Sequence, residues 1–226
     1  MGRLIIFDVD GTLVDSQHLI CAAMGRAFAG EGLAAPERSA ILSVVGLSLP
    51  EAMMRLTLKV DEGTVLNLCN AYKGAFGELR RTEPTEALYP GALEAIGALA
   101  GEGAVLGIAT GKSQRGVRHL LETYDLARHF TTIQTADDAP SKPHPAMIEQ
   151  ALAETGLGPE SAVMVGDTTF DMAMARNAGV AGYGVAWGYH KPDVLLAAGA
   201  CDVAPDFAGL LEGLARLRAT RIETPP

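Results

Sequence analysis

Short apolar runs alternate with helix-like segments through most of the chain after Tyr89. The run AVLGIAT at residues 104–110 has no polar alternation, which is typical of a strand covered on both faces. Repeated strand–helix units predict a parallel sheet with helices on both faces, joined by right-handed crossovers. The predicted strands span residues 104–110, 131–135, 161–167, 183–187 and 201–203. The predicted helices span residues 91–101, 113–124, 145–155, 169–179 and 207–218, with another around Val194.

Residues 17–86 interrupt this alternation. They contain helix-like stretches at 20–33, 50–58 and 62–81 and no convincing strand. A strand-like run at residues 3–7 is therefore separated from the rest of the sheet by a helical block. The pattern predicts an α/β protein in which a helical insertion lies over the carboxyl edge of a parallel sheet, where such sheets bind their ligands.

Composition and charge narrow the classes of partner. The 226 residues are 48% hydrophobic, and the net charge of −9 argues against nucleic acid, which is bound by clustered Lys and Arg. The apolar run before Asp8 is far shorter than the roughly 20 residues that span a bilayer, so no membrane partner is expected. Widely spaced cysteines without a CxxC pair predict free thiols in a reducing compartment, so the expected location is cytoplasmic.

The stretch FDVDGTLVDS follows the first predicted strand and carries the first candidate site. Residues two apart on a strand face the same side, so Asp8 and Asp10 can both point into one cleft. Two carboxylates this close repel each other, and one takes up a proton unless a cation lies between them. The alternative is a strand end whose acids face solvent or cap a helix.

Polar residues also follow three later predicted elements. Thr110 and Gly111 end a strand before a helix, where a hydroxyl and exposed N–H groups can bind phosphate, although Thr-Gly turns are common. Lys142 lies in the proline-rich stretch SKPHP, where the alternative is a solvated loop lysine. Asp167 ends another strand, and Asp171 is one helical turn further on, where it can also stabilise the helix N-terminus.

These residues are expected to meet at one edge of one sheet. Together they provide a nucleophile, an acid–base partner, donors for phosphoryl oxygens, and hard oxygen ligands for Mg²⁺. That set suits phosphoryl transfer.

The segments FDVDGTLVDS, IATGKS, SKPHP and VGDTTFD resemble, in order, the four motifs of the haloacid dehalogenase-like hydrolase superfamily, and the resemblance spans nearly the whole chain. It implies a Rossmann-like, doubly wound core of residues 1–16 and 87–226, with an inserted α-helical cap of residues 17–86. Within the superfamily, the chain looks most like the phosphoglycolate phosphatases and their relatives.

The resemblance also implies roles for the motif residues. Asp8 would attack phosphorus and form an aspartyl-phosphate. Asp10 would protonate the leaving oxygen and then deprotonate the water that hydrolyses the intermediate. Thr110 and the N–H groups around Gly111 would bind phosphoryl oxygens, and Lys142 would pair with the nucleophile and the developing charge.

The implied cofactor is Mg²⁺. Its ligands would be the carboxylates of Asp8 and Asp167 and the backbone carbonyl of Asp10. Asp171 would lie outside the coordination sphere and orient water or Lys142. Asp10 also favours phosphate chemistry over halide displacement, because halide leaves without a proton.

The predicted cap holds candidates for substrate choice. Arg55 is a candidate for binding a second anionic group, and its alternative is a surface arginine. Whether His18 and His144 contact substrate is left open. Candidates for contact with the leaving group, with a helix N-cap as the alternative, are Gly46, Leu47 and Ser48.

The leading hypothesis is a Mg²⁺-dependent phosphatase, monomeric or homodimeric, that hydrolyses a small phosphorylated metabolite such as phosphoglycolate. One alternative is a sugar phosphomutase, which shares all four motifs and needs a second phosphate site. We expect few cations in the cap, and this favours hydrolysis. The motifs are also compatible with inorganic pyrophosphate as the substrate, and with a non-catalytic binding module on the same scaffold.

Overall fold

The computed structural model describes residues 2–57, 60–82 and 86–222. Its central feature is a six-stranded sheet in the order β5-β4-β1-β6-β7-β8, with every neighbouring pair parallel. The order runs outward from β1 in both directions, so the crossovers diverge beside β1, where open α/β sheets bind ligands. The predicted parallel α/β sheet is confirmed. Its strands are β1 (Leu4–Phe7), β4 (Val105–Thr110), β5 (Phe130–Thr135), β6 (Ala162–Gly166), β7 (Ala181–Val185) and β8 (Ala200–Ala204).

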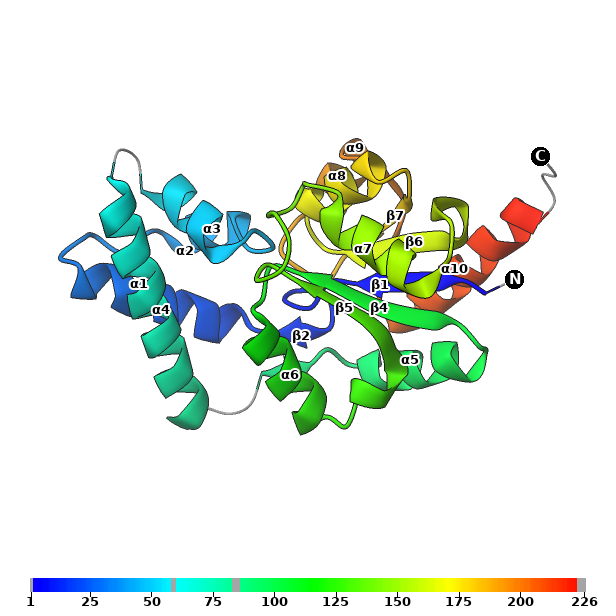
Figure 1. The fold of residues 1–226 in the computed structure, drawn as a ribbon, viewed down its shortest axis with the longest axis horizontal. Coiled ribbons are helices and arrows are strands. Elements are labelled where there is room, and N and C mark those ends of the chain that lie inside the picture. The colour runs from blue at the N-terminus through cyan, green and yellow to red at the C-terminus, as the bar shows by residue number, and fades with distance from the viewer. Residues whose placement is uncertain (1, 58–59, 83–85, 223–226) are drawn as a thin grey trace.

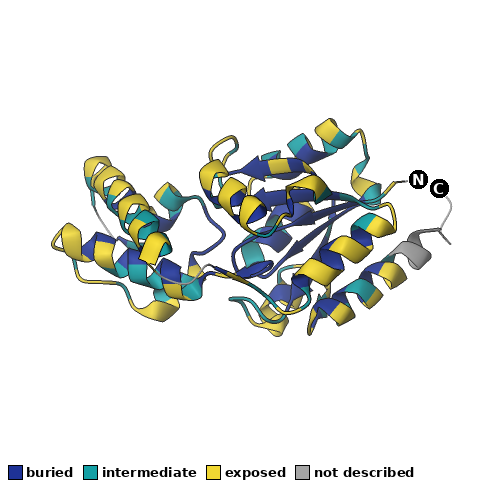
Figure 2. Ribbon diagram, turned by 90° about the horizontal axis from the view of Figure 1, so that it is seen from below, coloured by how far each residue is buried: buried dark blue, intermediate teal, exposed yellow. Residues whose placement is uncertain are grey.

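Helices cover both faces of the sheet (Figures 1 and 2). Ile5 and Phe7 point to one face, and Leu4 and Ile6 point to the other, as the two-residue period of a strand requires. Both sets are buried, which explains the continuous apolar runs in the sequence. The first face packs against α5 (Ala92–Gly101), α6 (Gln114–Thr123) and α10 (Phe207–Ile222). The second face packs against α7 (Ala146–Thr155) and α8 (Thr169–Asn177), while α9 (Pro192–Ala197) packs beside α8.

One predicted strand is displaced in the structure. The sequence predicted residues 183–187, whereas β7 spans Ala181–Val185. The ladder with β6 runs from Val163↔Ala181 to Gly166↔Gly184, and the chain turns directly after β7 ends. In that turn the indole N–H of Trp187 donates to the carbonyl of Thr12 at 3.0 Å, so Trp187 leaves the strand to brace the first motif.

A helical block lies beyond the carboxyl ends of the strands, to the left in Figure 1. It has its own apolar core, which includes Ile20, Met24, Phe28, Met53 and Leu68. Leu58 of the predicted helix 50–58 and residues 58–59 and 83–85 of the predicted cap lie outside the described residues. The helices of the block are α1 (Gln17–Gly30), α2 (Arg38–Ser43), α3 (Leu49–Leu56) and α4 (Glu62–Thr82).

Two short strands, β2 (Val14–Asp15) and β3 (Ala87–Leu88), form an antiparallel ribbon where the chain enters and leaves this block. The sequence prediction had neither strand, and it did not have α2. Each ribbon strand has only two residues, which is too short for an alternating pattern to be recognised.

Two expectations from composition are met in the described part of the chain. Cys21, Cys69 and Cys201 are free thiols. Among the described helices, none combines the length and the apolar character that crossing a bilayer requires.

Candidate active site

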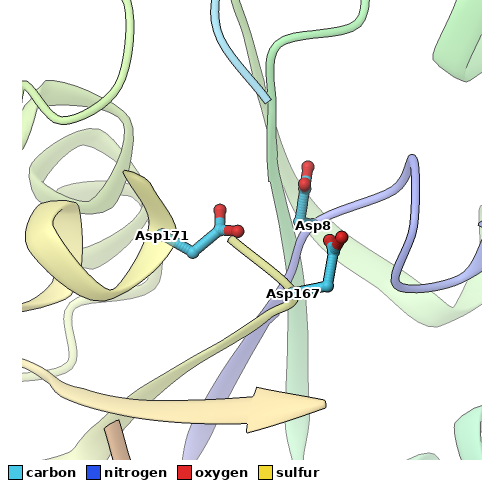
Figure 3. Close-up of side chains that lie close together, drawn as sticks. All are labelled: Asp8, Asp167 and Asp171. Atoms are coloured by element: carbon cyan, nitrogen blue, oxygen red, sulfur yellow. The ribbon is translucent and has the colours of Figure 1, made fainter. Parts of the chain in front are cut away.

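Three buried carboxylates meet at the carboxyl edge of the sheet (Figure 3). Asp8 follows β1, Asp167 follows β6, and Asp171 lies in the first turn of α8. Because β1 and β6 are hydrogen-bonded neighbours, Asp8 and Asp167 lie side by side, and Asp171 points toward them from the helix. One oxygen from each of the three lies within 4.8 Å of the others.

Asp8 is the least satisfied of these groups. It is fully buried, and neither of its carboxylate oxygens has a hydrogen-bond partner of good geometry among the described residues. The ammonium of Lys142 lies 3.0 Å from Oδ1 and forms an ion pair. Burial raises the pKa of Asp8 to about 7, although Lys142 acts in the opposite direction. A buried carboxylate with free lone pairs is costly unless something binds it, so Asp8 is suited to a cation or a phosphoryl group.

Asp167 is held in place on both oxygens. Thr12 donates its hydroxyl to Oδ1 at 2.9 Å, and the backbone N–H of Tyr189 donates to Oδ2 at 2.8 Å. Burial raises the pKa of Asp167 well above its usual range, and the negative charges of Asp171 and Asp8 act in the same direction. Each oxygen keeps further lone pairs, because a carboxylate oxygen can accept more than one bond.

Asp171 stabilises its helix and also holds Lys142. Its Oδ2 accepts from the backbone N–H and the hydroxyl of Thr168 at 3.0 and 2.7 Å, which completes a capping box at the start of α8. Its Oδ1 accepts from Lys142 at 2.6 Å. Burial alone would lower the pKa of Lys142, but Asp171 and Asp8 raise it above its usual value. Lys142 is thus a buried, charged group, and the alternative of a solvated loop lysine is wrong.

Asp10 points away from this cluster toward Lys112. The ammonium of Lys112 lies 2.8 Å from Oδ1 of Asp10 and 2.7 Å from Oε1 of Glu86, just before β3. The Lys112 side chain is only 8% exposed. Burial alone would lower the pKa of Lys112, but Asp10 and Glu86 raise it. Sequence reasoning assigned no site role to Lys112 or Glu86, because nothing local to either residue indicates a buried ion pair.

The second motif contacts a loop of the helical block. Thr110 ends β4 and is buried, and its hydroxyl accepts from the backbone N–H of Lys112 at 3.2 Å. A Cβ added at Gly111 would lie 2.5 Å from the carbonyl oxygen of Leu47 and 2.7 Å from that of Gly46. The backbone N–H of Ser48 donates to Oγ of Ser141 at 2.8 Å. Only glycine leaves room at position 111 for this loop to approach.

A cavity of about 480 Å³ lies between the sheet edge and the helical block. Asp10 faces it with the apolar side chains of Ile20, Met24 and Phe76 opposite. Predicted site residues in the lining are Asp8, Asp10, Thr110, Gly111, Gly46, Leu47 and Ser48. The lining also holds two cations of the helical block, Lys73 and Arg80, and Arg115 of α6 joins them from the sheet core.

Three other candidates lie away from the described lining of this cavity. Arg55 pairs with Glu51 at 3.1 Å and lies 5.2 Å over the ring of Phe170. His18 is exposed on α1. Nδ1 of His144 accepts from the backbone N–H of Ala146 at 3.2 Å, which is a local turn contact.

The donor set fits a hard divalent cation. Carboxylate oxygens are the ligands that Mg²⁺ prefers, and Asp8 keeps both of its oxygens without hydrogen-bond partners in the described structure. Asp171 is less available than Asp167, since its Oδ1 already binds the Lys142 ammonium and its Oδ2 already accepts two hydrogen bonds. Asp8 and Asp167 are therefore the side chains best placed to bind a metal.

Comparison with known proteins agrees with this geometry. Residues 5–185 match the family model of the haloacid dehalogenase-like hydrolases. "Probable phosphatase IndB" of Dickeya dadantii is 37% identical over 200 residues, which cover 88% of this chain and 87% of that protein. "Phosphoglycolate phosphatase" of Rhodospirillum rubrum is 33% identical over 217 residues, which cover 93% of this chain and 90% of that protein. A crystal structure of a hydrolase from Pseudomonas syringae has 26% identity and a TM-score of 0.85, covering 95% and 98% of the two chains.

The chain belongs to the haloacid dehalogenase-like hydrolase family. Its curated relatives place it with the phosphatases of that family, and the resemblance drawn from the four motifs is confirmed.

Proposed function

We propose that the protein is a Mg²⁺-dependent phosphomonoesterase that hydrolyses a small phosphorylated metabolite through an aspartyl-phosphate on Asp8. The observation that supports this most strongly is the state of Asp8 itself. It is fully buried, lies 3.0 Å from Lys142, has no hydrogen-bond partner in the described structure, and faces the cavity. A carboxylate so placed can attack a phosphorus atom that enters from the cavity side.

In the first half-reaction, Asp8 attacks phosphorus and the P–O bond to the leaving group breaks. Asp10 gives its proton to the leaving oxygen, so the product departs as a neutral alcohol. Lys142 and Thr110, with the N–H groups around Gly111, bind the phosphoryl oxygens whose charge grows in the transition state. In the second half-reaction, Asp10 takes a proton from water. That water attacks the aspartyl-phosphate, and inorganic phosphate and free Asp8 result.

Mg²⁺ would be held by the carboxylates of Asp8 and Asp167 and by the backbone carbonyl of Asp10. When bound, it supplies positive charge that keeps adjacent carboxylates ionised and offsets the charge of the phosphoryl group. Asp171 stays outside the coordination sphere and fixes Lys142, because its two oxygens are already engaged.

The substrate class we propose is a small phosphate monoester such as phosphoglycolate. Both the named phosphatase relatives and the size of the cavity, about 480 Å³, support a metabolite rather than a macromolecule. The loop of Gly46, Leu47 and Ser48 lines the cavity opposite the second motif and is the proposed contact for the leaving group.

A phosphomutase is the second candidate, because Lys73, Arg80 and Arg115 provide the cations that a second phosphate needs. Glucose 1-phosphate with a trace of glucose bisphosphate separates the two activities. If glucose 1-phosphate is isomerised and no free phosphate appears, the protein is a phosphomutase and the proposed phosphatase activity is wrong.

The proposal is tested by a phosphate-release screen in Mg²⁺ over phosphoglycolate, sugar phosphates, nucleotides and inorganic pyrophosphate. The Asp8→Asn variant serves as the control for contaminating phosphatases. We expect release from at least one small ester by the wild type and none by the variant. Equal rates for the two proteins would refute Asp8 as the nucleophile.

A further inference from the structure

A second cavity of about 360 Å³ lies between the C-terminal part of α4 and α6. Its lining is strongly cationic, with four arginines and a histidine against one acid. The full lining is Gly77, Arg80, Arg81, Arg115, Arg118, His119 and Glu122. We call it the arginine cleft. Since the whole chain carries a net charge of −9, this concentration of positive charge does not follow from average composition.

Among the described residues, no acid forms an ion pair with any of the four arginines. Within the described part of the chain, none of them forms an ion pair or a side-chain hydrogen bond, and Arg80 lies over the ring of Phe76 at 5.9 Å. By contrast, Arg55 pairs with Glu51, and Arg128 pairs with Asp125. Like charges that share a cleft repel each other, and an anion between them relieves that repulsion.

Helix stability explains the positions of only some of these arginines. Arg80 and Arg81 occupy the last turn of α4, where the helix dipole favours cations. Arg115, however, is the second residue of α6, where the dipole is positive and cations are disfavoured. The dipole of α6 therefore gives no reason for placing Arg115 beside the arginines of α4.

The arginine cleft is continuous with the cavity over Asp8. Gly77, Arg80 and Arg115 line both spaces. One molecule can therefore present a phosphoryl group to Asp8 and extend past Arg80 and Arg115 toward Arg81 and Arg118. In Figure 1 the two helices belong to different parts of the fold, α4 to the helical block and α6 to the sheet core, so an anion in the cleft also bridges these parts.

We propose that the arginine cleft binds a second phosphate group, carried at the far end of the substrate from the ester that is hydrolysed. Phosphate is the matching chemistry, because it is a dianion with several acceptor oxygens and guanidinium groups bind it in a bidentate way. Within the proposed class of small phosphorylated metabolites, the preferred substrates are then those that carry a second phosphate at the far end, rather than phosphoglycolate itself. The identity of the hydrolysed ester rests on the proposed function, whereas binding of the second phosphate does not.

The test compares an alkyl monophosphate with the alkanediol bisphosphate of equal chain length, over a series of lengths. Wild-type kcat/KM should favour the bisphosphate at the length that spans the two cavities. The Arg81→Gln, Arg118→Gln double variant removes two charges that line the cleft and not the cavity over Asp8. The quantity compared is kcat/KM for the bisphosphate divided by kcat/KM for the monophosphate. We expect the double variant to lower this ratio by about tenfold or more, because each charged hydrogen bond to phosphate is strong.

The matched control is the Arg26→Gln, Arg128→Gln double variant, which removes the same net charge from exposed positions outside the cleft. It should leave the ratio at the wild-type value. An unchanged ratio in the cleft variant, or an equal fall in the control, would overturn the proposal.

Binding is measured separately by calorimetry on the Asp8→Asn protein, so the cleft can be tested even if no ester is hydrolysed. There the bisphosphate should bind more tightly than the monophosphate, and the cleft variant should remove the difference. If added inorganic phosphate binds the cleft while bisphosphate gains nothing over monophosphate, the site serves a free anion and the substrate proposal is wrong. Tight binding of an oligonucleotide in place of the bisphosphate would also overturn it.

Discussion

The ammonium of Lys112 lies 2.8 Å from Oδ1 of Asp10, the proposed general acid, and 2.7 Å from Oε1 of Glu86. Glu86 directly precedes β3, where the chain returns from the helical block, and its carbonyl accepts from the hydroxyl of Tyr124 at 2.7 Å. The buried side chain of Lys112 thus links Asp10 to Glu86, which lies where the helical block joins the core.

Lys112→Gln is therefore expected to lower kcat/KM by about 10- to 100-fold, because a misplaced general acid loses most of its effect. The loss should be largest for esters with poor leaving groups. In an Asp10→Asn background the same change should add little, since residues that act as a unit are not additive. A full further loss in that background would show that Lys112 acts independently of Asp10. Thermal unfolding of each variant checks that the fold is retained.

Asp8→Asn should reduce phosphate release to less than about one thousandth of wild type, because a carboxamide cannot form the acyl phosphate. Stability should not fall in metal-free buffer, since burial disfavours the charged form of Asp8 and the amide is neutral. Activity assays and thermal melts in EDTA measure the two effects. A variant that turns over at the wild-type rate would exclude this nucleophile.

Removal of divalent metal by EDTA should stop turnover, and added Mg²⁺ should restore it. Metal should also raise the Tm, because a ligand that binds the native state stabilises it. Asp167→Asn should increase the Mg²⁺ concentration needed for half-maximal activity by at least about tenfold. Asp193→Asn, at an exposed position on α9, is the control and should leave it unchanged. Full activity in EDTA would remove the metal from the mechanism.

Gly111→Ala should lower kcat/KM by about tenfold with little change in Tm. Its Cβ would lie 2.5 Å from the carbonyl oxygen of Leu47, so the loop that lines the cavity must move away. Gly74→Ala is the matched control, because its Cβ would have no neighbour within 4 Å in α4. Kinetics that match the wild type would mean that the loop does not need this close approach.

Alkaline pH should destabilise the protein partly through Tyr183. Burial raises the pKa of its hydroxyl to about 12, and the bond it donates to Asp202 at 2.9 Å acts in the same direction. The unfolded chain loses this proton near the usual value of 10, so the stabilising contribution is complete below pH 10 and is lost as the pH rises toward 12. Tyr183→Phe should flatten the fall in unfolding free energy over that window. Urea titrations across the pH range measure it, and an unchanged slope would contradict the prediction.

The sheet core was largely predictable from sequence because its strands are buried on both faces. The run at residues 104–110 became β4 (Val105–Thr110), and the helix predicted at 113–124 became α6 (Gln114–Thr123). The strand predicted at 183–187 was displaced, because the two glycines of β7 (Ala181–Val185) weaken the pattern and a tertiary contact of Trp187 ends the strand.

The four motifs were predictable because each lies at a strand end or in the stiff loop of Lys142. Their partners were not. Glu86 and Lys112 are 26 residues apart in sequence, and Asp10 and Lys112 are 102 apart, so no local pattern links them. The arginine cleft was missed for the same reason, since Arg81 and Arg118 meet only when α4 is placed beside α6. The available signal was the RR pair at the end of one predicted helix and the R-x-x-R spacing in another.

The β2–β3 ribbon has an architectural consequence. Asp15 and Ala87 are direct partners in its ladder, so the backbone leaves the core and rejoins it at adjacent points. The residues between Asp15 and Ala87 form an insertion that leaves the core and returns to it at the same place. A tight hairpin turn could connect β2 directly to β3 without disturbing the Rossmann-like core. An insertion of another length or fold could therefore replace the helical block at this point while the strands of the core keep their places.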